Sequence, residues 1–64
     1  MISALRGRVF TISPGDVQVE TAGGAIYRVL IPVSNYSKIK KEKEVLLYTV
    51  LRVKEDQMVL YGFR

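Results

Sequence analysis

Residues 45–63 of the chain read VLLYTVLRVKEDQMVLYGF, two apolar runs on either side of a short charged segment. The apolar runs are rich in Val, Leu and Tyr, side chains that fit a pleated, half-buried surface. The pattern therefore predicts a hairpin of two strands, residues 45–53 and 58–63, whose turn carries the adjacent carboxylates Glu55 and Asp56. A hairpin this apolar is expected to be buried along its length, which leaves its polar tip free to meet a partner.

Length and composition narrow the classes of protein to consider. The 64 residues allow one domain with one small core, and the sequence has no Cys and no His, so disulfides and the usual zinc-ligand sets are excluded. The longest apolar runs fall far short of the roughly 20 residues that a membrane helix needs, so we expect no membrane contact. The absence of Cys fits a reducing compartment, so we expect a cytoplasmic location. The net charge of +4 permits a nucleic-acid partner, although many ordinary basic domains carry such a charge.

Three further strands are predicted upstream of the hairpin. Residues 2–12, 17–21 and 25–31 show period-two alternation, and turns with Pro-Gly and Gly-Gly separate them. A glycine inside the first strand, Gly7, indicates a bend or a close backbone approach. One face of this strand is expected to carry Leu5, Gly7, Val9 and Thr11.

Residues 33–39 are the one segment with a helical pattern, and Ser34 is its expected N-cap. A charged connection follows, in which four lysines between positions 38 and 43 are mixed with Glu42 and Glu44. Mixed signs favour a solvated loop over a purely basic nucleic-acid tract, while a phosphate contact stays open. The same two interpretations apply to two arginines of the first strand, Arg6 and Arg8.

Five short strands with a helical piece after the third predict an all-β fold. The layout is that of a small OB-fold, a five-stranded Greek-key barrel with a short helical turn between its third and fourth strands. An SH3-like barrel is the main rival. Residues 1–64 are accordingly expected to form one barrel domain.

Catalysis finds little support in the residues. The sequence lacks His and Cys, a Ser–base constellation and a Walker loop. Glu55 and Asp56 are neighbours on a turn, not carboxylates that face each other across a cleft, so glycosidase chemistry is not indicated. We expect no catalytic residues, no metal site and no cofactor.

The order and spacing of several fragments resemble the N-terminal domain of the RuvA family, the bacterial Holliday-junction recognition subunits. The most specific fragment is the Glu55-Asp56 turn followed four residues later by Leu60-Tyr61-Gly62-Phe63. The other matching fragments are Met1-Ile2, Leu5-Arg6-Gly7, the Gly-Gly turn that leads into Tyr27-Arg28-Val29, Pro32, Thr49 and Val53-Lys54. Together they cover the whole chain.

This resemblance implies a non-catalytic DNA-binding and oligomerisation domain for recombination, repair and branch migration. Such domains are OB-folds at the centre of a homotetramer, and their carboxylate turn, here Glu55 and Asp56, is an acidic pin at the crossover of a four-way junction. The family often has Arg before this pair, where this chain has Lys54, so the charge for a phosphate contact is kept and the bidentate geometry is not. The resemblance also implies that the 64 residues are a fragment of a longer chain. The parts absent here are helix-hairpin-helix motifs and a C-terminal domain that engages the separate RuvB ATPase of the helicase complex.

The alternative is a generic OB-type module that binds single-stranded nucleic acid by stacking. Stacking needs exposed aromatic side chains on the strand surface. Most aromatics of this chain lie within apolar runs and are therefore expected in the core or at an interface. The aromatic side chains are Phe10, Tyr27, Tyr36, Tyr48, Tyr61 and Phe63.

Overall fold

The computed structural model describes residues 3–55 and 57–64, with the backbone alone at 54 and 57. Five strands and one helix follow one another along the chain. In chain order they are β1 (Ala4–Ser13), β2 (Asp16–Glu20), β3 (Ile26–Leu30), α1 (Val33–Ile39), β4 (Glu44–Lys54) and β5 (Gln57–Phe63). The helix stands between the third and fourth strands, as the sequence predicts.

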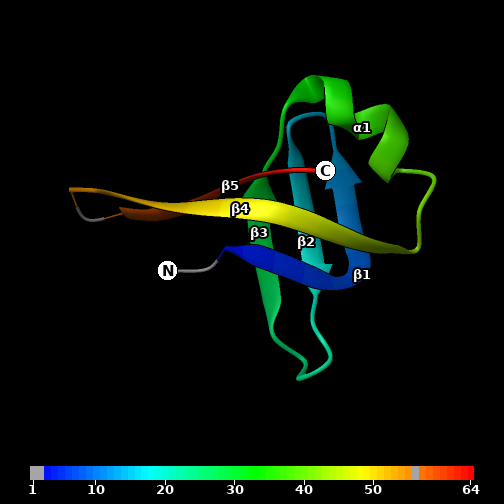
Figure 1. The fold of residues 1–64 in the computed structure, drawn as a ribbon, viewed down its shortest axis with the longest axis horizontal. Coiled ribbons are helices and arrows are strands. Elements are labelled where there is room, and N and C mark those ends of the chain that lie inside the picture. Colours follow the sequence, from blue (N-terminus) through cyan, green and yellow to red (C-terminus); the bar gives the residue numbers. More distant parts are fainter. Residues whose placement is uncertain (1–2, 56) are drawn as a thin grey trace.

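The strands close into a barrel in the order β1-β2-β3-β5-β4, with β4 paired back to β1 (Figure 1). Every pairing is antiparallel except β3 with β5, which is parallel and consists of two residue pairs. A closed Greek-key barrel with a helix before its fourth strand is the OB layout, which confirms the predicted fold class.

The core is formed by inward-facing side chains of all five strands, one residue of the helix and one residue of the connection between β3 and α1. Alternation along β2 buries Val17 and Val19 completely, and the same period along β4 buries Val45 and Leu47. Ile39, at the end of α1, is also fully buried, so the helix covers one end of the barrel. The remaining buried apolar side chains are Leu5, Val29, Ile31 and Leu60.

A β-bulge in β1 changes which residues face the core. The register of β1 against β2 shifts between Val9 and Thr11. The extra residue reverses the alternation, so Thr11 is exposed and Ile12 packs against the core. The prediction that Thr11 shares the inner face with Leu5 is therefore wrong, because uninterrupted alternation cannot anticipate a bulge.

Gly7 is a close-approach position, as the sequence indicates. A Cβ at Gly7 would collide with the backbone oxygen of Glu20 on the neighbouring strand. Gly62 is similarly crowded, because a Cβ there would lie 2.7 Å from the Val29 Cγ1. Only glycine lets β1 and β5 pack this closely against their neighbours.

The start of α1 differs from the prediction. Pro32, not Ser34, is the N-cap, and no side chain caps the helix. Pro32 has an extended backbone with φ −60° and ψ 141°, and its carbonyl accepts a hydrogen bond from the Asn35 N–H at 2.9 Å. The fixed φ of proline sets up the first turn, so Ser34 becomes an exposed residue inside the helix.

Candidate functional site

The tip of the β4–β5 hairpin is a two-residue turn. The strands stay paired out to Lys54 and Gln57, so the connection consists of Glu55 and Asp56. Glu55 is exposed and has φ +47°, the one positive φ at a non-glycine residue in the described part of the chain. A positive φ at the first turn position is typical of the turns that match the twist of paired strands. The turn thus holds the Glu55 carboxylate outward at the end of the hairpin.

The other two predicted site residues are Lys54, of which the structure describes the backbone alone, and Asp56, which it does not describe. Lys54 is the last residue of β4 and immediately precedes Glu55. Its side chain lies outside the described structure, and so does Asp56 as a whole. Their roles therefore remain predictions, and the geometry bears on Glu55 alone.

The hairpin projects beyond the barrel (Figure 1). Pairing of β1 with β4 ends at Tyr48, and pairing of β3 with β5 starts at Leu60, so residues 52–58 have no flanking strand. We call residues 52–58 the projecting arm. Val53 and Met58, which face each other across the arm, are 67% and 72% exposed. The expectation that the hairpin is buried along its length is wrong here, because no third element reaches the arm.

The described charges of the arm are free to act on an external partner. Glu55 and Arg52 are exposed, and neither forms an ion pair with any other residue that the structure describes. By contrast, Arg28 on β3 is held by the Asp16 carboxylate, with Nε 2.6 Å from Oδ2. The sequence analysis did not anticipate this pair. In the register of β2 and β3, Asp16 lies opposite Leu30, so Arg28 is its diagonal neighbour on the same face. A predicted register could therefore have suggested the ion pair.

A second unusual surface lies on the same hairpin, closer to the barrel. Tyr48 and Val50 on β4 face Phe63 and Tyr61 on β5, and all four are exposed. The rings of Tyr48 and Phe63 have centroids 6.1 Å apart. Leu46 extends this row along β4. We call these five side chains the outer apolar face.

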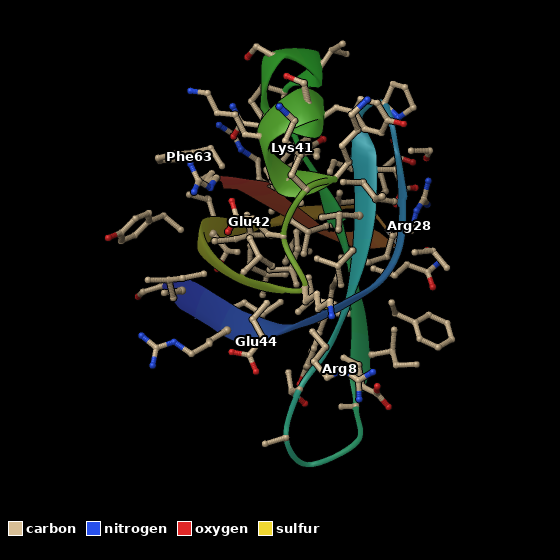
Figure 2. The ribbon with its side chains drawn as sticks, turned by 90° about the vertical axis from the view of Figure 1, so that its right-hand side faces the viewer. Arg8, Arg28, Lys41, Glu42, Glu44 and Phe63 are labelled. Atoms are coloured by element: carbon tan, nitrogen blue, oxygen red, sulfur yellow. The ribbon has the colours of Figure 1, made fainter. Side chains whose placement is uncertain are left out.

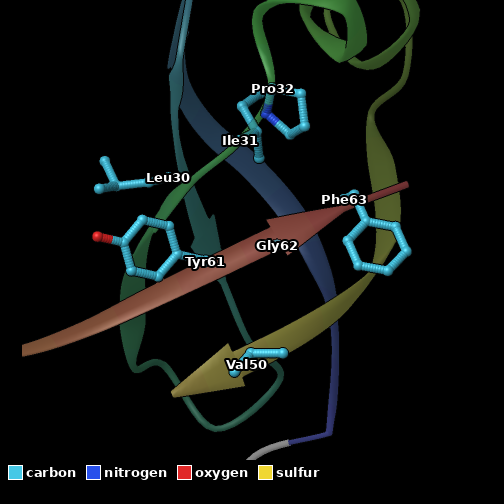
Figure 3. Close-up of a pocket in the computed structure, with 7 residues that line it drawn as sticks. All are labelled: Leu30, Ile31, Pro32, Val50, Tyr61, Gly62 and Phe63. Atoms are coloured by element: carbon cyan, nitrogen blue, oxygen red, sulfur yellow. The ribbon is translucent and has the colours of Figure 1, made fainter. Parts of the chain in front are cut away.

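The outer apolar face opens into a hollow of about 390 Å³ (Figure 3). The hollow lies where the chain leaves β3 and crosses the end of β5. Its lining is almost entirely apolar and consists of Leu30, Ile31, Pro32, Val50, Tyr61, Gly62 and Phe63. Exposed contiguous apolar surface on a small domain indicates contact with another macromolecule.

The aromatic side chains were predicted in the core or at an interface, and for those of the hairpin the core is wrong, while the interface stays a prediction. Phe10, Tyr48 and Phe63 are each more than half exposed, and Tyr61 is 39% exposed. Tyr27 packs against the core. The outer surface of β1, β2 and β3, as far as it is described, therefore carries one exposed aromatic ring, Phe10, whereas the hairpin carries three.

Two further findings limit the chemistry of the described residues. They contain no cluster of three or more potential metal ligands. They also include no helix long and apolar enough to cross a membrane.

The comparisons with known proteins identify the family. The model of the RuvA N terminal domain matches residues 1–62. A relative from Solibacter usitatus named Holliday junction branch migration complex subunit RuvA is 47% identical, over 98% of this chain and 32% of its own length. Relatives of the same name from Symbiobacterium thermophilum and Thermodesulfovibrio yellowstonii are 42% and 35% identical over 98% of this chain. The chain spans about a third of the length of these curated relatives. Since the match with the family model covers residues 1–62, from before the first strand into the last, the chain belongs to the RuvA N-terminal domain family.

Proposed function

We propose that this chain is the junction-contacting and oligomerisation domain of a Holliday-junction branch-migration subunit, acting in recombination and repair. The observation that carries the proposal is an arm that projects from the barrel (Figure 1) and has the exposed carboxylate of Glu55 at its end. Family membership supports it, and so do the names of relatives that match nearly the whole chain. In this proposal the 64 residues act as the first domain of a chain as long as those relatives.

The carboxylate turn acts by repulsion. DNA backbones are dense lines of negative charge, so Glu55 and Asp56 raise the free energy of any duplex that crosses the tip. The repulsion is screened over about 8 Å at physiological salt, which confines its effect to the point of crossing. An open four-way junction has a hole at its centre and avoids the repulsion, whereas a continuous duplex does not. The turn therefore selects junctions by excluding duplex DNA.

Selection of this kind requires several tips around one axis. The outer apolar face supports self-association, because its exposed aromatic and aliphatic side chains are adjacent and lead into an apolar hollow. A homotetramer places four carboxylate turns, eight carboxylates in all, around the crossover. Lys54 then lies next to each turn, where its ammonium group contacts a phosphate of the strand that bends away.

The other functions of the branch-migration subunit belong to regions outside this domain. In a chain as long as the relatives, helix-hairpin-helix motifs supply most of the phosphate contacts. A further, motor-binding domain engages the RuvB ATPase. The domain itself performs no catalysis and works in the cytoplasm, where the chromosome is. Its task is to set the geometry of the crossover for the motor.

The test compares four-way junction, duplex and single-stranded DNA in electrophoretic titrations of the full-length protein. The Glu55→Ala, Asp56→Ala double variant should raise duplex affinity on the order of tenfold, more than junction affinity, because only the duplex must cross the axis. The gain should shrink as salt rises. Glu20→Ala, which removes a carboxylate from the side of the barrel, should leave the junction-to-duplex ratio unchanged.

Other outcomes contradict the proposal. Unchanged or reduced duplex affinity in the presence of chelator ends the repulsion argument. If the double variant binds DNA more weakly than wild type when Mg²⁺ is present, but not when chelator is present, the carboxylates hold a metal ion. Preference of the wild-type protein for single strands favours the stacking module instead.

A further inference from the structure

Four lysines form an exposed basic surface where α1 leads into β4. We call Lys38, Lys40, Lys41 and Lys43 the lysine patch, and all four are exposed. None of them forms an ion pair with a residue that the structure describes. Figure 2 shows Lys41 at the end of α1, with Glu42 and Glu44 further along the connection. The patch is thus a concentration of uncompensated positive charge on a small domain.

The carboxylates in this segment do not cancel the patch. Glu42 points to the C-terminal residue, where its carboxylate forms an ion pair with the Arg64 guanidinium. Counting the described pair as neutral, four lysines remain against Glu44, a local charge of +4 − 1 = +3. In the sequence, the mixture of Lys and Glu in this segment favours a plain solvated loop. In the structure the segment is a basic surface, because one of its two carboxylates is paired elsewhere.

The backbone under the lysines is held in place. The Lys40 N–H donates to the Tyr36 carbonyl and the Glu42 N–H donates to the Ile39 carbonyl, each at 2.9 Å. The Val9 N–H donates to the Lys43 carbonyl at 2.9 Å, which ties the connection to β1. Burial of Ile39 anchors the same turn in the core. A segment whose backbone is already fixed loses less conformational freedom on binding than a flexible loop does.

The patch and the carboxylate turn lie at opposite ends of β4 (Figure 1). This direction is the longest dimension of the domain, 34 Å. Screening over about 8 Å makes the two charged regions independent of each other. A separation of this size corresponds to about ten base pairs of duplex DNA, one helical turn.

We propose that the lysine patch binds the phosphate backbone of a duplex arm, about one helical turn from the crossover. The inference rests on the proposed function, since it takes the turn at the tip to mark the crossover. Lysine ammonium groups are point charges that contact phosphate regardless of sequence. The patch guides each arm outward from the centre, while the carboxylates at the tip keep the centre free of continuous duplex.

Nucleic acid is favoured over an acidic protein as the occupant. A protein–protein contact is centred on a desolvated apolar or aromatic anchor. The aromatic ring of this segment, Tyr36, is half-buried, and the Lys40 ammonium lies over it at 5.3 Å from the ring centroid. The surface around the four lysines therefore offers charge and little apolar area.

The experiment varies the arm length of the junction. Titrations use junctions whose hairpin-closed arms have about 6 or about 16 base pairs, the shorter ones ending ~20 Å from the crossover and so short of the patch. The protein is full-length, with all four lysines changed to Gln. Affinity for the long-armed junction should fall about tenfold at low salt, and the slope of log K against log salt should drop by about 0.9 for each phosphate that the patch no longer neutralises. Affinity for the short-armed junction should stay within about twofold.

Two matched variants control for side effects. Changing the four lysines to Arg keeps the charge and should restore the affinity for long arms. Glu44→Gln removes the one described carboxylate beside the patch that is not paired, and it should strengthen binding to long arms alone. Circular dichroism checks that each variant is folded, which the exposure of every changed residue leads us to expect.

The outcomes separate this inference from the proposed function. A wild-type protein that prefers junctions, combined with Gln variants that keep the wild-type affinity for long-armed junctions, overturns the lysine patch and leaves the proposed function standing. Equal weakening for both arm lengths also overturns it, since the contact is then at the crossover. Unchanged DNA binding with loss of RuvB ATPase binding assigns the patch to a protein partner. A wild-type protein without junction preference overturns both.

Discussion

The inner part of the β4–β5 hairpin and the projecting arm both carry apolar side chains, but these side chains have opposite environments. Val45 and Leu47 are 3% and 0% exposed, whereas Val53 and Met58 are 67% and 72% exposed. The difference is in the neighbours, because β1 and β3 flank the inner part and stop before the arm. An apolar, β-branched sequence therefore specifies a strand, while the elements beside it decide whether the strand is buried.

The largest expected effect is a difference in the free energy of unfolding between a substitution in the buried inner part and one in the exposed arm. Leu47→Ala should lower the free energy of unfolding by about 2–5 kcal/mol, because it leaves a cavity in the core of a small domain. Met58→Ala removes a comparable volume from the arm and should change it by less than about 0.5 kcal/mol. Urea denaturation followed by circular dichroism measures both. Similar losses for the two variants would mean that the arm is buried in solution.

The next prediction concerns the outer apolar face, whose side chains are more exposed than those of the core and less exposed than Val53 and Met58 of the arm. Val50→Asp should weaken self-association by about 100-fold, some 2.7 kcal/mol, because a charge is then buried in an apolar interface. Unfolding of the monomer should change little, since Val50 is 45% exposed. Light scattering over a range of protein concentrations gives the association constant. Ala22→Asp, in an exposed turn, is the control, and an equal effect there would exclude the outer apolar face as the interface.

A glycine sharpens the comparison within β5. Gly62→Ala should cost about 1–3 kcal/mol of unfolding free energy, since its Cβ would meet the Val29 Cγ1 and the neighbouring strand. Gly23→Ala, where a Cβ has no neighbour within 4 Å, should be nearly neutral. Thermal and urea unfolding of the pair test the close packing of the inner hairpin. A neutral Gly62→Ala would show that the barrel yields easily at this point.

The smallest expected effect is at the tip. Glu55→Asn should raise the free energy of unfolding by about 0.5–1 kcal/mol, because Asn tolerates a positive φ better than Glu does. Glu55→Gln keeps the shape and removes the charge, so it serves as the control and should leave stability unchanged. A gain with Asn and none with Gln shows that the turn holds Glu55 in a strained conformation, as functional turns often do. A loss with Asn contradicts this.

Much of the fold could be predicted from the sequence, because alternation and turn residues act locally. The five strands were predicted with bounds within two residues of those observed, and the helix was placed correctly within residues 33–39 although its start was predicted after an N-cap at Ser34. The bulge at Phe10 was not predictable, since nothing in the sequence marks the reversal of alternation at Thr11. The N-cap at Pro32 was missed because Ser34 is the stronger local signal.

The candidate site was less predictable than the fold. The turn with Glu55 was located from its position between two apolar runs, and the structure places Glu55 exposed at that turn. The outer apolar face was anticipated only as aromatic side chains within apolar runs, which do not reveal how far the face is exposed. The ion pair of Glu42 with Arg64 joins residues far apart in the sequence, so the net charge beside the lysines could not be worked out from the local pattern.

The two-pair parallel contact between β3 and β5 has a consequence for the folding kinetics. Val29 and Leu30 meet Leu60 and Tyr61 about thirty residues later in the chain, whereas β1–β2–β3 and β4–β5 are joined by short connections. Local hairpins close within microseconds, while contacts across long loops form late because loop closure is entropically costly. The meander and the hairpin should therefore form as separate units, and the barrel should become complete only when these two residue pairs and the equally long-range β1–β4 pairs have joined.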